Sequence, residues 1–147
     1  VLSEVLDRFV ESDFSRTTDV NVINNICFAL AEVGRIEEAE LFIRQCSVHF
    51  HKNAYLTATL GLINFRKGRH ERGELLYREA VSLAVKSSDK VRIRQKLNLE
   101  IGRALATSKP AQSRRALDRV VKEKQGERQL VRQALDILAE TDRKAGR

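Results

Sequence analysis

The sequence predicts an all-α fold built from repeated helical pairs, and three observations lead to this prediction. First, the stretch from Val20 to Ser87 reads as one unit written twice, because Gly34 returns as Gly68 and Cys27 as Gly61 at one constant offset. Second, apolar residues in this stretch recur at helical spacing. Third, the 147-residue chain has one proline and seven glycines and almost no alternating β-branched runs. Self-similarity of fixed period is typical of a stacked repeat array.

The first copy, residues 20–53, predicts two helices separated by a glycine turn. Ile23 and Leu30 belong to the apolar face of a helix that ends near residue 33. Gly34 follows, at the place where glycine commonly terminates a helix. Ile36 and Ile43 then begin and continue the apolar face of a second helix, to about residue 49. The second copy, residues 54–87, predicts helices over about 53–67 and 70–86 on either side of a second glycine turn.

This pattern resembles the tetratricopeptide repeat, a helix–turn–helix unit of about 34 residues. Two closely crossing helices need small residues at the crossing and large ones beside it. The positions that match the family's small and bulky sites are Cys27, Gly61, Ala39, Gly73, Ile43, Tyr77, Cys46 and Ala80. The resemblance implies a right-handed α-solenoid of tetratricopeptide-like repeats. The alternative is a bundle of antiparallel helices whose loops are evenly spaced.

The flanking segments predict incomplete units of the same array. Residues 1–15 place Leu2, Val5 and Phe9 at second-helix positions, one full period before their counterparts in the first copy. We therefore expect a partial unit there, in a fragment of a longer protein, with a dedicated capping helix as the alternative. No methionine occurs in the chain, not even at position 1, so we expect processing or truncation.

The remaining residues complete one helical-repeat domain over 1–147. Residues 88–125 predict a degenerate third repeat, with helices over 90–107 and 111–124 separated at Pro110, a residue that suits a first turn. Residues 127–144 predict a C-terminal helix with Leu130, Ala134, Leu135 and Leu138 facing inward.

The sequence favours neither catalysis nor a bound cofactor. It has no phosphate-binding glycine loop and no hydrolase or metalloprotease motif. His49 and His51 lie two residues apart, on different faces of a helix, so we predict no metal site. Cys27 and Cys46 are expected to be small buried thiols, although they could lie close enough for a disulfide. With no signal peptide or membrane-length apolar run, a cytoplasmic protein without membrane contact is expected.

The resemblance implies a protein–protein interaction scaffold, an adaptor or chaperone-like binder. In that family, the first helices of successive units line a concave groove that holds an extended peptide or an amphipathic helix. The groove would have an apolar floor, unless some of these residues only pack against neighbouring helices. The family's carboxylate clamp is broken, because Asn24 and Phe28 replace its lysine and asparagine. The predicted groove residues are Asn21, Asn24, Asn25, Phe28, Tyr55, Ala58, Leu62, Phe65 and Arg66.

The charge distribution raises two alternative functions. Residues 1–85 carry 10 Lys and Arg against 12 Asp and Glu, whereas residues 86–147 carry 17 against 8. The basic half could bind nucleic acid, although it has no aromatic residue to stack on bases. An acidic protein partner and a merely solvated helix face are the other interpretations. Self-assembly is also open, because an incomplete first unit would expose apolar surface. The predicted basic face comprises Arg92, Arg94, Lys96, Arg103, Arg114, Arg115, Arg119 and Lys122.

Overall fold

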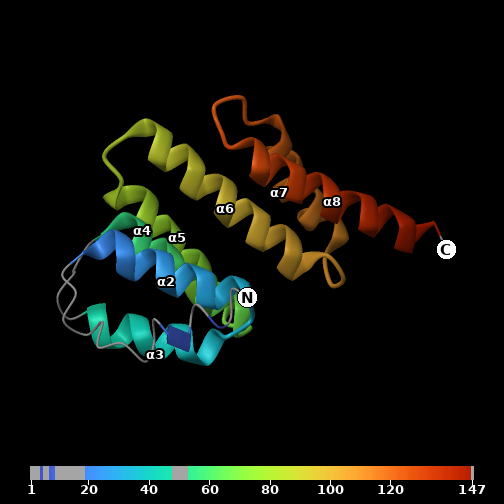
Figure 1. The fold of residues 1–147 in the computed structure, drawn as a ribbon. Coiled ribbons are helices and arrows are strands. Elements are labelled where there is room, and N and C mark those ends of the chain that lie inside the picture. Colours follow the sequence, from blue (N-terminus) through green and yellow to red (C-terminus); the bar gives the residue numbers. More distant parts are fainter. Residues whose placement is uncertain (1–3, 5–6, 9–18, 48–52, 147) are drawn as a thin grey trace. The chain divides into compact units, whose positions relative to one another are not determined.

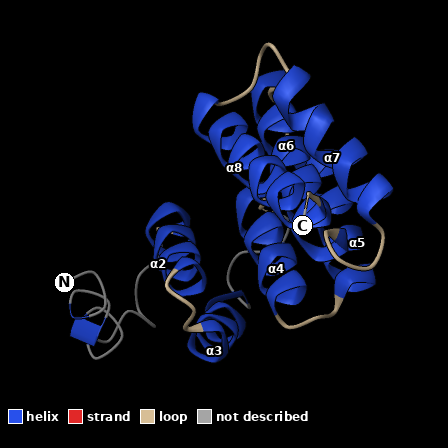
Figure 2. Cartoon of the chain, turned by 90° about the vertical axis from the view of Figure 1, so that its right-hand side faces the viewer, coloured by secondary structure: helices blue, strands red, loops and turns tan. Residues whose placement is uncertain are grey.

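The described part of the chain consists of helices and the turns between them and divides into two compact units. The computed structural model describes residues 4, 7–8, 19–47 and 53–146, and these residues form seven helices and no strand (Figures 1 and 2). The prediction of an all-α fold is therefore confirmed. The first unit covers residues 1–83 and the second residues 84–147. The charge counts given above for residues 1–85 and 86–147 also hold for these two units, because Ala84 and Val85 are uncharged.

The first unit contains two helical pairs at the predicted spacing. These are α2 (Val20–Glu32) with α3 (Ile36–Ser47), and α4 (Ala54–Arg66) with α5 (His70–Leu83). Each helix of the second pair begins at the same offset from its counterpart as Gly68 from Gly34. The sequence predicted that the second helices of the two pairs end near residues 49 and 86. Residues 48–52 lie outside the described residues, and α5 ends at Leu83.

The two pairs repeat the same caps and turns. Asp19 and Asn53 cap α2 and α4, each accepting a backbone N–H bond through its side-chain oxygen, at 2.9 and 3.0 Å. Both first helices end in a Schellman turn. Gly34 and Gly68 take φ values of 86° and 79°, a left-handed conformation that favours glycine. The next residue donates its N–H back to a carbonyl of the last helical turn, at 2.9 Å in both copies.

The crossing of α4 and α5 brings their backbones into close contact at two glycines. A Cβ on Gly61 would lie 3.1 Å from the Gly73 carbonyl oxygen, and one on Gly73 would lie 3.0 Å from the Gly61 oxygen. Each glycine is covered by a ring, since Phe65 packs over Gly73 and Tyr77 over Gly61. The ring centroids of Phe65 and Tyr77 are 6.0 Å apart. The aromatic volume thus occupies the space that the missing side chains leave.

In the first pair, the residues at the helix crossing are larger than in the second pair, and the residues beside the crossing are smaller. At the equivalent positions Cys27 and Ala39 replace the two glycines, while Ala31 and Ile43 replace the two rings. All four side chains are buried, with at most 2% exposure. Cβ atoms at the crossing are therefore accompanied by smaller neighbours, as constant packing density requires.

This exchange of volume predicts a strongly non-additive double variant. We expect Gly73→Ala to destabilise the protein by about 1–3 kcal/mol through overpacking, because its Cβ would lie 2.7 Å from Phe65 Cδ2. Phe65→Ala should cost about 3–5 kcal/mol by emptying the core. Combined, the two substitutions reproduce the Ala31 and Ala39 combination of the first pair, so the loss should be smaller than the sum. Urea unfolding of the double-mutant cycle measures this coupling.

The matched control is Gly146→Ala at the exposed end of the chain, where a Cβ would meet only ordinary contacts. Additive losses at Gly73 and Phe65 would show that the two positions do not share one volume.

The second unit consists of three helices around a small apolar core. These are α6 (Ser87–Leu105), α7 (Pro110–Lys122) and α8 (Arg128–Ala145), with Pro110 in the first turn of α7 as predicted (Figure 1). At the α6–α7 crossing, Ser113 Oγ donates to the Gly102 carbonyl at 2.6 Å, and Leu117 packs over Gly102. The core comprises Leu99, Leu117, Val120, Leu130 and Ala134.

Two local predictions for this unit were wrong. Residues 87–89 were predicted to link two helices, but they form the first turn of α6. There the negative charge of Asp89 interacts favourably with the positive end of the helix dipole. Leu135 was predicted to face inward, but it is 49% exposed. The buried stripe of α8 follows Leu130 and Ala134, one helical turn apart, and the next residue along the helix is turned about 100° away from it.

A buried glutamine fastens all three helices of the second unit. Gln95, 2% exposed in α6, donates from Nε2 to the Val120 carbonyl of α7 at 3.3 Å. Its Oε1 accepts the Glu127 N–H at the start of α8, at 2.9 Å. Gly126 lies directly against this amide, because a Cβ there would overlap the Gln95 side-chain amide. A side chain at this position of the α7–α8 turn would therefore have to displace the Gln95 amide from its hydrogen bonds.

We expect Gly126→Ala to destabilise the second unit by about 1–3 kcal/mol, since the new Cβ must displace a satisfied buried amide. Thermal unfolding followed by circular dichroism measures the loss. A substitution of the neighbouring exposed residue, Gln125→Ala, is the control and should change stability by less than about 0.5 kcal/mol. Equal stability of the two variants would contradict the described contact.

Candidate functional site

The predicted groove residues fall into three groups by exposure. Asn21, Asn25 and Arg66 are exposed, and Asn24, Phe28 and Tyr55 are partly buried. The three remaining predicted groove residues, Ala58, Leu62 and Phe65, are buried, with at most 7% exposure. Phe65 in particular covers Gly73 and stacks on His70 with centroids 5.7 Å apart. It therefore serves the α4–α5 contact rather than the floor of an open groove.

The first helices α2 and α4 contact each other within the first unit. Thr59 Oγ1 in α4 donates to Asn24 Oδ1 in α2 at 2.6 Å, which commits one acceptor of this amide to the helix contact. Near the ends of the helices, Arg66 pairs with Glu32 at 3.5 Å. The fully exposed predicted groove residues are thus polar, whereas Phe28 and Tyr55 are each partly buried. We call Asn21, Asn25, Tyr55 and Arg66 the α2–α4 strip.

A buried carboxylate with several cationic partners in the first unit was not predicted from the sequence. Glu40 in α3 has a side chain only 9% exposed and accepts hydrogen bonds from three cations. Lys67 Nζ lies at 2.5 Å, Arg44 Nη2 at 2.6 Å and Arg69 Nη1 at 3.2 Å. Lys67 also donates to Glu37 at 2.9 Å. Since Lys67 and Arg69 flank the α4–α5 turn, this carboxylate ties one helical pair to the next.

A related contact lies at the first glycine turn, directly after Gly34. Arg35, the counterpart of Arg69, pairs with Glu38 and also with Asp7 at 2.7 Å. The described residues 4, 7 and 8 are helical, whereas the rest of the predicted first segment, residues 1–15, lies outside the described residues. The hydrogen bond from Arg35 lowers the pKa of Glu38. Both glycine turns therefore present an arginine to an acid of an earlier helix.

These contacts shift proton affinities in opposite directions. Hydrogen bonding from Lys67, and then from Arg69, holds the pKa of the Glu40 carboxyl below its usual range. The same bond, with that to Glu37, raises the pKa of Lys67. The Glu40 cluster consequently stabilises the fold above the unfolded carboxyl pKa of about 4.3 and below the unfolded lysine pKa of about 10.4.

The predicted basic residues separate into paired and unpaired cations. Arg92 pairs with Glu127, Arg103 with Glu100 at 2.7 Å, and Arg114 with Asp142. Lys96 is partly buried. The four other predicted cations are exposed and make no ion pair within the described ranges; they are Arg94, Arg115, Arg119 and Lys122. The basic face is thus narrower than predicted.

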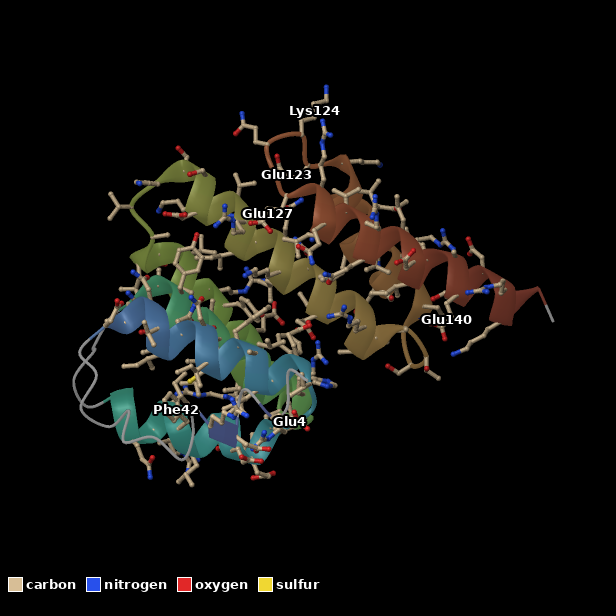
Figure 3. The ribbon with its side chains drawn as sticks, in the orientation of Figure 1. Glu4, Phe42, Glu123, Lys124, Glu127 and Glu140 are labelled. Atoms are coloured by element: carbon tan, nitrogen blue, oxygen red, sulfur yellow. The ribbon has the colours of Figure 1, made fainter. Side chains whose placement is uncertain are left out.

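Three of these four cations line one cavity of about 340 Å³ between α6 and α7. Arg94 comes from α6, and Arg119 and Lys122 come from one face of α7. Val91, Asn98 and Glu123 complete the rim around Gln95, and Figure 3 shows Glu123 where α7 turns toward α8. We call this cavity the α6–α7 cleft.

A second cavity, of about 510 Å³, lies between the α6–α7 turn and the end of α8. Glu140, labelled in Figure 3, lines it together with Lys144, to which it is paired at 3.0 Å. Arg103, which also lines it, is engaged by Glu100 and by Gln133 at 3.2 Å. The charged side chains that line this cavity are therefore largely neutralised by ion pairs with other residues of the second unit.

Neither metal ligands nor membrane spans emerge from the described residues. Among them, no group of three or more His, Cys, Asp and Glu side chains is placed to hold a metal ion. His49 and His51 lie outside this set. No helix in the described ranges combines the length and apolarity needed to cross a membrane. No protein-family model, curated protein or solved structure matches the chain.

The Glu40 cluster predicts a specific pH dependence. We expect Glu40→Gln to lower the free energy of unfolding at pH 7 by about 1–2 kcal/mol, because charge-assisted hydrogen bonds to three cations are lost. The wild-type protein should lose this increment as the pH falls from about 4.3 through the lowered pKa of Glu40, so the two stability curves converge in acid.

Denaturant unfolding between pH 7 and pH 3 measures both curves. Glu79→Gln, an exposed carboxylate on α5 with the same change in charge, is the control and should run parallel to the wild type. If Glu40→Gln also ran parallel, the cluster would not be the source of the acid sensitivity.

Proposed function

We propose that this chain is a protein-binding scaffold of the tetratricopeptide type. The observation that carries the proposal is the structural repeat in the first unit. Equivalent caps, equivalent left-handed glycine turns and small buried residues at equivalent positions, Cys27 with Gly61 and Ala39 with Gly73, recur at a single offset along the chain. Helix–turn–helix units of this kind typically stack and use the resulting surface to bind other proteins.

The proposal includes a right-handed solenoid that continues into a degenerate third pair, α6 and α7. The short α6–α7 turn, which is like the turns of the two regular pairs, supports this continuation, and so does the close crossing at Gly102, which is like that of α4 and α5. The α6–α7 turn nevertheless lacks the left-handed glycine of the two regular turns. A terminal unit that departs from the consensus is common in such arrays.

The proposed binding surface is the α2–α4 strip. Because Ala58, Leu62 and Phe65 are buried, the surface is more polar than the apolar groove that the sequence predicted. The Asn25 amide can both donate and accept, as a peptide backbone requires, and the Tyr55 ring offers a partly exposed aromatic contact. The partner is accordingly an extended peptide or the polar-edged face of an amphipathic helix.

We expect the variant Asn21→Ala/Tyr55→Ala to weaken partner binding at least about tenfold, since aromatic and amide contacts are concentrated in the strip. Nuclease-treated lysate of the source cell, passed over the immobilised chain, provides the partner, and titration of the purified partner gives Kd.

The matched control, Gln45→Ala/Ser82→Ala, removes two exposed neutral side chains from the second helices α3 and α5. It should bind like the wild type. A partner lost equally from both variants, or recovered only with nucleic acid, would contradict the proposal.

A further inference from the structure

The α6–α7 cleft gathers positive charge that the described residues do not neutralise. Arg94, Arg119 and Lys122 line it, and none of them pairs with a carboxylate in the described part of the chain. One carboxylate, Glu123, also lines the cleft, so three cations face a single anion there. Arg115 extends the same face of α7 by one further turn. Such a lining attracts an anionic ligand and repels a cationic one.

The lining of the cleft is partly apolar as well as positively charged. Val91 contributes an aliphatic wall, and the methylene stems of the two arginines and the lysine add further apolar surface below their charged ends. A ligand that carries both carboxylates and aliphatic side chains would satisfy both parts. A nucleic-acid backbone would use only the charges, and residues 84–147 contain no aromatic side chain to stack on bases.

The cleft is also held in a fixed geometry. Gln95, which lines it, is fastened to Val120 of α7 and to the Glu127 N–H, so the separation of α6 and α7 is set by buried hydrogen bonds. Asn98 donates from Nδ2 to the Arg94 carbonyl at 3.1 Å, and its Oδ1 can accept from a ligand N–H. A cleft that is formed before binding loses less conformational entropy when it is occupied.

We infer that the α6–α7 cleft is a docking site for an acidic protein segment, one that presents Asp or Glu together with aliphatic side chains at helical spacing. The stripe from Arg115 to Lys122 is about 10 Å long and matches about two turns of a bound helix. This site lies within the second unit and does not depend on the α2–α4 strip proposed above.

The test uses the full chain and a fluorescein-labelled peptide of glutamate and leucine, about 18 residues long so that it can form a helix. Fluorescence anisotropy at constant salt gives Kd. Arg94→Gln/Arg119→Gln should raise Kd at least about tenfold. Arg128→Gln/Arg132→Gln is the matched control. It removes the same charge from two positions on α8 outside the cleft and should change Kd less than about twofold.

Amide NMR spectra of the titrated chain provide a second readout. Resonances of residues 91–98 and 115–123 should shift, while those of the α2–α4 strip should not, which separates this inference from the proposed function. If the cleft variant fails to fold, judged by circular dichroism, Lys122→Gln replaces it in the same comparison.

Several outcomes would overturn the inference. Equal weakening by the cleft and control variants would reduce the binding to attraction by net charge. Displacement of the peptide by a tighter-binding double-stranded DNA fragment would identify a nucleic-acid site. Absence of peptide binding to the wild-type chain, or shifts confined to α2 and α4, would show that the cleft does not receive an acidic segment.

Discussion

The close approach of paired helices at their crossing is the constraint on which the rest of the structure depends. At Gly61 and Gly73 the two backbones nearly touch, and the rings of Phe65 and Tyr77 fill the space beside them. A crossing this close needs matched volumes, because protein interiors tolerate neither voids nor overlap. The first pair meets the same condition with Cys27 in place of one glycine. In the first pair the crossing residues are larger and the residues beside them are smaller, so the two changes in size oppose each other.

The second unit satisfies the constraint with polar as well as apolar contacts. Ser113 and Leu117 close the α6–α7 crossing over Gly102, and Gln95 joins α7 and the start of α8 to α6. A buried amide with both ends bonded specifies one arrangement, because any shift would leave a polar group unsatisfied. The same amide lines the α6–α7 cleft. Packing and the proposed ligand site therefore share one fixed element.

The two units present different chemistry to their surroundings. In the first, acids such as Glu40 are engaged by the cations around the glycine turns, and the α2–α4 strip that remains is polar. In the second, Arg94, Arg119 and Lys122 form no ion pair with a described carboxylate, although Glu123 lines the same cleft. The proposed functions follow this division, with a peptide-binding strip on the near-neutral unit and an acidic partner on the basic one. Binding through each surface should consequently respond differently to salt, since only the second relies on charge.

The sequence by itself determined the helical class, the repeat period, the glycine turns and the pairs of small and bulky positions. These features are local or periodic, and the left-handed turns at Gly34 and Gly68 require only the residue and its neighbours. Exposure was decided by the tertiary structure. Phe65 has the helical position of a groove residue, yet its ring is buried because Gly73, which has no side chain, leaves space for it in the core. Glu40 and Gln95 gained their roles from partners on other helices, far along the chain, a separation that no local pattern reveals.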